Sequence, residues 1–369
     1  MAHPGLDALA GAVAERDAGA FVHVGDRFDA TMRYLTGYDG PERPATFVSA
    51  DDQAVLCVTE TDAARAAREF PGVVYGPDDC EGTPGERAVA VLDATADDGT
   101  VLAPPHLPHD AALRVERAGY DLASTTAVAE ARRQKTDAER EHVRSVAAAA
   151  EAGVRRAATV LAATDADGGR LVWDGDPLTT ERLRREVDIA LADEGVSDAG
   201  NTVVETTGPG DAGDPIEAGA TVLVDLAPRG PAGYHARLAR TFAVAGEGGW
   251  ERRAHVAVER GLRLATGYLS AGTPVEKLHQ ETHFEVAAYG FGLDDVEEAI
   301  GHGVGLRPRE PPFLPGDGEL VAGDVVSVAP TIADPEQGRV RLADLYLVTE
   351  DGFEALTTYP RSMVPDPEP

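Results

Sequence analysis

The sequence predicts a two-domain protein, with a small α/β domain over residues 1–131 followed by a larger α+β domain over residues 132–369. Three observations support this prediction. The length of 369 residues suits two domains of ordinary size. Apolar strand-like runs alternate with amphipathic runs in the first third of the chain, and a long helical pattern near residue 132 separates them from a second set of strands and helices.

The first domain is predicted from a series of short apolar runs. The strand-like runs are AFVHVG, ATFVSA, QAVLCVTE and, after the helical run TDAARAAREF, the apolar run AVAVLDA. This alternation is typical of a small α/β domain.

The second domain is predicted to begin with a long helix in RRQKTDAEREHVRSVAAAAEAGVRRAATVLAAT. Thr136 or Asp137 can cap it, and Glu139 in its first turn complements the helix dipole. A second helix, ERLRREVDIALADEG, ends at Gly195. The later strand and helix patterns are TVVETT, TVLVDLA, ARTFAVAG, ERRAHVAVERGLRLATGYL, VEKLHQETHFEVAAYG, DVVSVAPTI and LADLYLVTE. They predict helices on one side of a curved, mostly antiparallel sheet.

The composition is that of a folded protein with an unusual charge. Hydrophobic residues make up 43% and charged residues 26% of the chain, which argues against disorder. Lys and Arg number 33 against 64 Asp and Glu, a net charge of 33 − 64 = −31, and only Lys135 and Lys277 are lysines. Such a field disfavours binding to nucleic acids and anionic membranes. The excess of acidic residues and the scarcity of lysine are typical of a halophilic, haloarchaeal protein. We interpret them as adaptation to high salt and not as a sign of a functional site.

Cysteine content and the N-terminal segment indicate a cytoplasmic location. Cys57 and Cys80 are too few for a disulfide framework or a four-thiolate zinc site. The first residues, MAHPGLDALAGAVAERDAG, lack the basic and apolar regions of a leader peptide.

Six segments, in order, resemble one family. RRQKTDAER, GPGDAGDP, GATVLVDLAPRGPAGYHARLARTF, GHGVGLRPREPP, LVAGDVVSVAP and VRLADLYLVTEDG are similar to the family of aminopeptidase P, prolidase, methionine aminopeptidase and creatinase. The segment MRYLTGYDG resembles the creatinase-type N-terminal domain. The resemblance implies a pita-bread C-terminal domain behind a creatinase-like α/β domain, a dimer in many members, and a two-metal site held by two aspartates, one histidine and two glutamates. Carboxylates that bridge two hard divalent ions activate water near neutral pH.

The resemblance places only two of the five metal ligands on residues that can bind metal. The first aspartate falls on Asp225 and the histidine on His302, whereas Arg237 occupies the position of the second aspartate. No Asp or Glu lies between Leu226 and Ala245, so a shift of the alignment does not supply one.

The other family positions are also changed. The glutamate positions are Ala329 and Ala343, and a further histidine position is Arg309. A histidine that follows the family's Gly-Pro-Asn turn is here Pro215 or Asp214. Two ligands are too few to hold a catalytic ion firmly, so we predict no metal cofactor.

We expect the vacated site to hold a built-in cation. Asp225 and Arg237 lie on adjacent strands of a predicted hairpin, so we expect the guanidinium to reach Asp225, with His302 contributing a neutral ring nitrogen and Ala329 and Ala343 leaving the space. His235 lies two residues before Arg237, on the same strand face. It is either a replacement ligand or base, or an incidental histidine of the pocket wall.

Three functions follow from these residues. The first is a homologue without metallopeptidase activity that binds a peptide-like or anionic ligand at Arg237 and Arg309 and pairs with itself or a paralogue. The second is a metal-independent, creatinase-like hydrolase with histidine as acid and base. The third is an active Xaa-Pro peptidase that uses Mn, Co or Zn with ligands from unusual positions. Fold alone does not decide among them.

Overall fold

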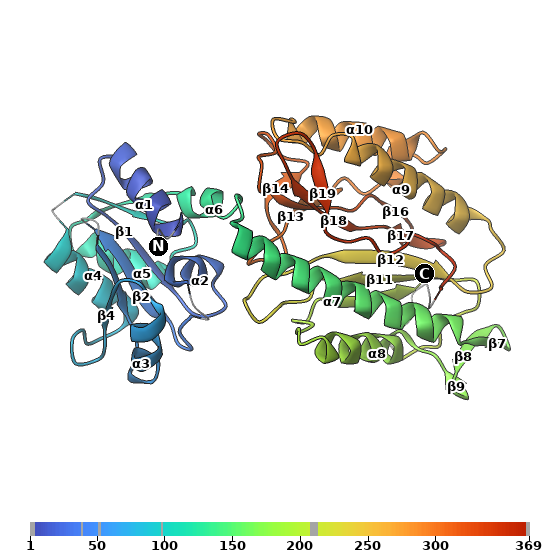
Figure 1. Ribbon diagram of the computed structural model, residues 1–369, viewed down its shortest axis with the longest axis horizontal. Helices are drawn as coiled ribbons and strands as arrows, with labels where there is room; N and C mark the ends of the chain where they lie inside the picture. The colour runs from blue at the N-terminus through green and yellow to red at the C-terminus, as the bar shows by residue number, and fades with distance from the viewer. Residues whose placement is uncertain (1–3, 38–39, 51–52, 97–98, 207–212, 367–369) are drawn as a thin grey trace. The chain divides into compact units, whose positions relative to one another are not determined.

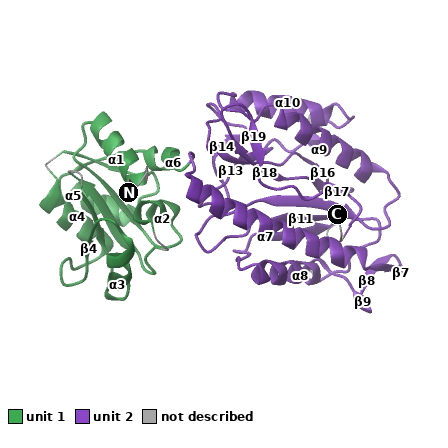
Figure 2. Ribbon diagram, viewed as in Figure 1, with its two compact units in different colours: residues 1–132 green, residues 133–369 purple. Residues whose placement is uncertain are grey.

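The chain forms two compact units, residues 1–132 and residues 133–369 (Figure 2). The computed structural model describes residues 4–37, 40–50, 53–96, 99–206 and 213–366. The sequence-based boundary lies between residues 131 and 132. Among the described residues, no helix combines the length and apolar character needed to cross a bilayer.

Unit 1 contains, within its described residues, a six-stranded mixed sheet. Its strands, which follow one another across the sheet in the order β4-β3-β2-β1-β5-β6, are β1 (Ala20–Gly25), β2 (Ala45–Ala50), β3 (Gln53–Cys57), β4 (Val73–Tyr75), β5 (Thr100–Ala103) and β6 (Asp121–Ser124). The central strand β1 pairs antiparallel with β2 and parallel with β5. The helices of this unit are α1 (Pro4–Glu15), α2 (Ala30–Thr36), α3 (Glu60–Glu69), α4 (Pro84–Thr95), α5 (His109–Arg117) and α6 (Ala127–Ala131).

The run AVAVLDA forms part of helix α4, so its assignment as a strand was wrong. Thr83 and Glu86 form a capping box at the start of this helix, and Pro84 occupies its first turn. The buried residues Ala88, Val91 and Leu92 have the spacing of one helix face. The capping box therefore starts a helix that continues through the short apolar run.

Unit 2 begins with α7 (Asp137–Ala162), and α8 (Thr180–Asp193) packs against it. Thr136 is the N-cap: its side chain accepts from the backbone N–H of Glu139, whose carboxylate accepts in turn from Thr136. Figure 1 shows α7, in green, running along β11 (Thr221–Leu226) and β12 (Leu238–Ala243). The predicted helix and its cap are confirmed.

The strands of unit 2 pair antiparallel in the described part of the chain. β10 (Thr202–Thr206) completes a three-stranded sheet with β11 and β12. A five-stranded sheet contains β14 (Glu310–Leu314), β13 (Gly301–Gly303), β15 (Val325–Val328), β18 (Asp344–Val348) and β19 (Phe353–Ala355), in that order. Smaller sheets contain β7 (Asp165–Asp167), β8 (Arg170–Trp173), β9 (Asp176–Pro177), β16 (Thr331–Asp334) and β17 (Gly338–Arg341).

The expected α+β class is confirmed, but the single curved sheet is not. The run DVVSVAPTI divides into β15 and β16, which belong to different sheets. Pro330 lies between them, and proline cannot donate a hydrogen bond to a continuing ladder.

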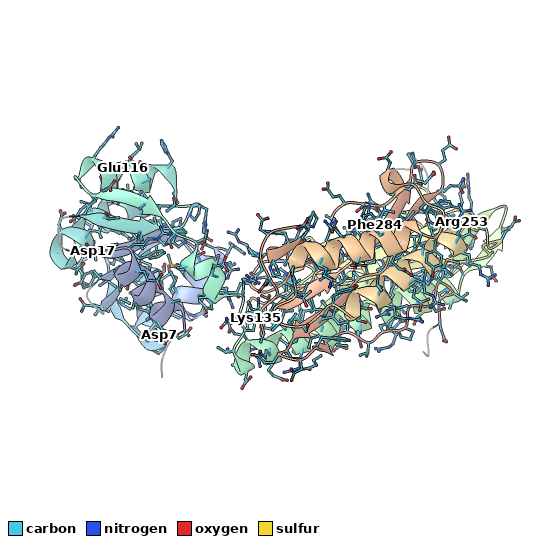
Figure 3. All side chains as sticks on the ribbon, turned by 90° about the horizontal axis from the view of Figure 1, so that it is seen from above. Asp7, Asp17, Glu116, Lys135, Arg253 and Phe284 are labelled. Atoms are coloured by element: carbon cyan, nitrogen blue, oxygen red, sulfur yellow. The ribbon has the colours of Figure 1, made fainter. Side chains whose placement is uncertain are left out.

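Helices α9 (Trp250–Thr266) and α10 (Val275–Ala287) form a second pair in unit 2. Figure 3 labels Arg253 and Phe284 on this pair, and Lys135 just ahead of α7. Helix α9 contacts β17 and α10 contacts β14. The first helix pair thus contacts β10, β11 and β12, and the second pair contacts β14, β16 and β17.

Candidate functional site

Three sheets bring a group of charged side chains together in unit 2. Asp225 lies in β11, Arg237 directly precedes β12, His302 lies in β13 and Arg341 ends β17. Asp225 and Arg237 come from one hairpin, whereas His302 and Arg341 lie far from them along the chain, so only the folded domain assembles the group.

The carboxylate of Asp225 accepts hydrogen bonds from two arginines. Its Oδ2 atom lies 2.6 Å from Nη2 of Arg237 and 2.8 Å from Nη1 of Arg341. The side chain of Asp225 is 7% exposed and that of Arg237 is 15% exposed. Charge-assisted bonds of this kind are short and strong, so Asp225 is neutralised by protein cations. The contact between Arg237 and Asp225 expected from the sequence is present.

Arg237 also contacts His302, from its second terminal nitrogen. Nη1 of Arg237 lies 3.2 Å from Nε2 of His302. Nδ1 of His302 lies 3.0 Å from the carbonyl oxygen of Gly303, so these partners assign the proton to Nδ1 and leave Nε2 as the acceptor. Burial lowers the pKa of His302 to about 4, and the positive charge of Arg237 acts in the same direction. The ring is therefore neutral near pH 7.

An apolar patch takes up the space beside these charges. Ala239, Ala329 and Ala343 cluster with Leu223 and are buried. The backbones of Ala239 and Ala343 exchange two hydrogen bonds, each 3.1 Å long. Ala329 and Ala343, which the resemblance aligns with the family's glutamates, thus lie in one cluster with Ala239, the strand partner of Asp225.

Arg341 was not predicted as a site residue, although it lies in the segment VRLADLYLVTEDG that resembles the family. Its Nε donates to the hydroxyl of Thr331 at 2.8 Å, and its Nη2 donates to Glu297 at 2.7 Å. Although burial opposes the charge, Asp225 and Glu297 raise the pKa of Arg341 above its ordinary value. No spacing in the sequence indicates these contacts, because they join β17 to β11 and to the segment before β13.

The ion pairs continue from this group to an open pocket. Glu297 also binds Arg339 at 3.0 Å, and Arg339 binds Glu205 at 2.9 Å. A pocket of about 710 Å³ is lined by Leu223, Glu205, Arg339 and neighbouring residues of β10, β11, β16 and β17. Leu223 and Asp225 share one face of β11, so the pocket adjoins the charged group.

His235 lies in the wall of the domain rather than in the charged group. Its Nδ1 donates to the carbonyl of Ala227 at 3.1 Å, and its backbone N–H donates to Gly305 at 2.8 Å. Burial lowers its pKa, which favours the neutral ring. These bonds support the interpretation of an incidental wall histidine.

Arg309 is exposed, and its charge contributes to the low pKa of His302. The next residue, Glu310, is buried and accepts from Lys135 at 2.8 Å. Asp214 is exposed, and Pro215 forms an isolated bridge with Thr179. The start of GPGDAGDP, residues 208–212, lies outside the described residues.

The residues at this place do not fit a centre of two metal ions. Of the five positions that the resemblance aligns with metal ligands, Asp225 and His302 offer metal-binding atoms, and Arg237 contacts both. The guanidinium of Arg237 stays charged and would repel a dication bound to Asp225 or His302. The alanines at 329 and 343 supply no oxygen donor from their side chains.

Residues 141–350 match metallopeptidase family M24. The chain is 30% identical over 151 residues to the uncharacterized peptidase YqhT of Bacillus subtilis, which covers 40% of this chain and 42% of that protein. It is also 30% identical over 151 residues to the Xaa-Pro dipeptidase of Pyrococcus furiosus, covering 40% of this chain and 43% of that protein. The matched part is thus less than half the length of these relatives.

Solved structures share the fold along nearly the whole chain. The prolidase of Pyrococcus horikoshii has a TM-score of 0.84 at 18% identity, covering 97% of this chain and 99% of that one. An Xaa-Pro dipeptidase of Bacillus anthracis has a TM-score of 0.85 at 18% identity, covering 98% of both chains. The N-terminal domain of a FACT complex subunit from chickpea (Cicer arietinum) has a TM-score of 0.77 at 12% identity, covering 98% of this chain and 97% of that one. The chain therefore belongs to metallopeptidase family M24 and has a mixed α+β pita-bread fold with an N-terminal domain.

Proposed function

We propose that the protein is a non-hydrolysing member of this family that binds a peptide-like ligand through a carboxylate. The observation that carries the proposal is the guanidinium of Arg237, held between Asp225 and His302. The resemblance implies that the positions of Asp225, Arg237 and His302 bind metal ions in the family. The guanidinium of Arg237 supplies a fixed positive charge in place of those ions. Replacement of the other ligand positions by Ala329 and Ala343 makes room for it.

The remaining donors favour an anionic group. Nε of Arg237 is buried and has no hydrogen-bond partner within the described chain. Arg309 is exposed near His302. A carboxylate can accept forked hydrogen bonds from guanidinium groups. The relatives that carry the name Xaa-Pro dipeptidase suggest a ligand with the chemistry of a short peptide.

The geometry disfavours the two hydrolase alternatives. A metal-independent hydrolase needs a histidine free to exchange a proton, yet both ring nitrogens of His302 are engaged and His235 binds a backbone carbonyl. A two-metal peptidase needs oxygen donors that Arg237, Ala329 and Ala343 do not provide. We also propose that the protein is cytoplasmic and that it pairs with itself or with a paralogue.

A binding experiment tests the ligand class. Isothermal titration calorimetry would compare an Xaa-Pro dipeptide with its C-terminal amide, on the wild type and on Arg309→Ala. Loss of a charge-assisted hydrogen bond costs about 1.5–3 kcal/mol, so we expect binding weaker by about tenfold or more for the amide and for the variant. Arg307→Ala, which removes an exposed arginine two residues away, should bind like the wild type. Equal binding of acid and amide would contradict the proposal.

A hydrolysis assay separates the three functions. Release of proline from the dipeptide would be measured with Mn²⁺, Co²⁺ or Zn²⁺ and with a chelator, in about 1 M KCl to screen the protein's charge. We expect the wild type to release no more proline than the double variant Asp225→Asn, Arg237→Ala, which serves as the control. Release that stops on chelation would support the peptidase instead, and release that survives chelation would support the metal-independent hydrolase.

A further inference from the structure

A second group of polar side chains lies in unit 1, away from the family's site. It contains His23 in β1, Asp29 at the N-cap of α2, and His106 shortly after β5. β1 and β5 are parallel neighbours, so their carboxyl ends meet at one edge of the sheet. Ligands commonly bind at such an edge of a parallel sheet.

The three side chains have the spacing of a metal-ligand set. Nε2 of His23 lies 2.9 Å from Oδ1 of Asp29, and Nε2 of His106 lies 3.3 Å from Oδ2. The candidate ligand atoms all lie within 4.8 Å of one another. Metal–nitrogen and metal–oxygen bonds of about 2.0–2.1 Å in a tetrahedral shell put ligand atoms about 3.3 Å apart. Small side-chain shifts would therefore place one ion at bonding distance from all three residues.

The surrounding backbone fixes the carboxylate in this arrangement. The N–H of Met32 donates to Oδ1 of Asp29 at 2.7 Å, which leaves Oδ2 directed toward His106. A methyl group at Gly25 would lie 2.8 Å from Cβ of Asp29 and 3.1 Å from Nε2 of His23. The glycine thus permits the close approach of the two residues, and the cap bond orients the ligand from outside.

The environment differs from that of a surface ion pair. His23 is 0% exposed, and its Nδ1 has no partner within the described residues. In the described part of the chain, Asp29 is the hydrogen-bond partner of this ring, which also packs edge-on against the ring of His106, whereas buried histidines usually have both nitrogens satisfied. The side chain of His106 is 38% exposed and gives access from solvent. Burial raises the pKa of Asp29, but hydrogen bonds from His106 and His23 outweigh it and hold that pKa well below its usual range, so the carboxylate is ionised.

We propose that His23, Asp29 and His106 bind one divalent transition-metal ion in unit 1. Two imidazoles and one carboxylate suit Zn²⁺, Co²⁺ or Fe²⁺ better than Mg²⁺ or Ca²⁺, which prefer oxygen ligands. Among the residues that the structure describes, this is the one group of three or more His, Cys, Asp or Glu side chains with such spacing. The site lies outside the residues singled out from the sequence and does not depend on the function proposed for unit 2.

The test titrates metal-free full-length protein with Co²⁺ and follows the visible absorption of the bound ion. About 1 M KCl suppresses non-specific binding to the acidic surface. We expect one Co²⁺ per chain, displaced by one equivalent of Zn²⁺. His106→Ala should weaken Co²⁺ binding by at least tenfold, because loss of even an outer-shell partner costs about 10–100-fold. His106 is a partly exposed residue, and circular dichroism would verify that the variant is folded.

Two control variants make the result specific. His109→Ala removes an exposed histidine three residues from His106 and should bind Co²⁺ like the wild type. His302→Gln removes the histidine of the family position in unit 2 and should also leave binding unchanged. The proposal is overturned if the wild type binds no Co²⁺, if His106→Ala binds it equally well, or if His302→Gln abolishes binding.

Discussion

Arg341 and Arg237 donate to the same oxygen atom of Asp225, at 2.8 and 2.6 Å. One carboxylate thus binds two cations, one from the residue just before β12 and one from the end of β17. The loss of folding free energy should therefore differ between substitution of the carboxylate and substitution of one arginine. Removal of either arginine leaves Asp225 with the other, whereas removal of Asp225 leaves two guanidinium groups facing each other.

We therefore expect Asp225→Asn to be more destabilising than Arg237→Ala. Breaking a buried ion pair from one side costs about 3–5 kcal/mol, and that figure applies to Asp225→Asn. Arg237→Ala should cost about 1.5–3 kcal/mol, the range for loss of hydrogen bonds to a charged group. Urea denaturation followed by circular dichroism measures both.

Arg339→Ala is the control for this pair, since Arg339 is more exposed and exposed ion pairs contribute about 1 kcal/mol or less. If Arg237→Ala proves as costly as Asp225→Asn, Arg341 does not compensate and the shared-carboxylate interpretation is wrong.

Protonation of His302 should make the protein less stable in acid. Its pKa of about 4 in the folded protein lies below the value of about 6.5 for an exposed histidine. Between these pH values the unfolded chain binds the proton and the folded chain does not, so this contribution is complete above pH 6.5 and is lost as the pH falls through 4. The shift corresponds to about 3 kcal/mol.

The measurement is the difference in unfolding free energy between the wild type and His302→Gln from pH 7.5 to 4.0. Subtraction cancels the carboxylates that titrate in the same range. A difference that stays constant with pH would show that the His302 pKa is not depressed by the fold.

The sequence predicted the contact of Asp225 with Arg237 because the two residues are close along the chain, at the same end of one hairpin. It could not predict Arg341, which is 116 residues from Asp225 and reaches it only through the packing of different sheets. His23 was overlooked for a similar reason. Within AFVHVG it reads as one polar residue of a buried strand, and its partners come from a helix cap and from a loop after β5.

Local signals predicted some elements better than others. Thr136, one of the two caps expected from the sequence, is the N-cap of α7, and Glu139 lies in the first turn as expected. Thr83 and Glu86 form a capping box just ahead of AVAVLDA, so this run is helical although its apolar composition favours a strand. Pro330 marked the end of β15, but only the structure assigns the following residues to another sheet.

The pair formed by Lys135 and Glu310 should be a strong structural contact. Their side chains are 2% and 5% exposed, and Lys135 is one of only two lysines in the sequence. We expect Lys135→Met to lower the free energy of unfolding by about 3–5 kcal/mol, because it removes the cation from a buried carboxylate. Combining it with Glu310→Leu should recover part of the loss.

The matched comparison is the exposed pair of Arg144 with Glu354. Arg144→Met should cost about 1 kcal/mol or less. Equal costs at the two pairs would indicate that water reaches Lys135 and Glu310.

If the proposed function is correct, placing carboxylates at the positions that the resemblance aligns with metal ligands should create a metal site in unit 2. The triple variant Arg237→Asp, Ala329→Glu, Ala343→Glu would add three carboxylates beside Asp225 and His302 and remove the guanidinium that contacts both. Without an ion these carboxylates repel one another, so we expect the metal-free variant to melt below the wild type. Mn²⁺ or Co²⁺ should then stabilise it, because a ligand present at about 100 times its dissociation constant contributes about 2.7 kcal/mol.

The control is the double variant Ala329→Glu, Ala343→Glu, which retains Arg237. Metal should raise its melting temperature much less. Thermal unfolding with and without metal, in a His106→Ala background that removes the site proposed for unit 1, measures the effect. If both variants respond equally to metal, Arg237 is not what keeps metal from this site.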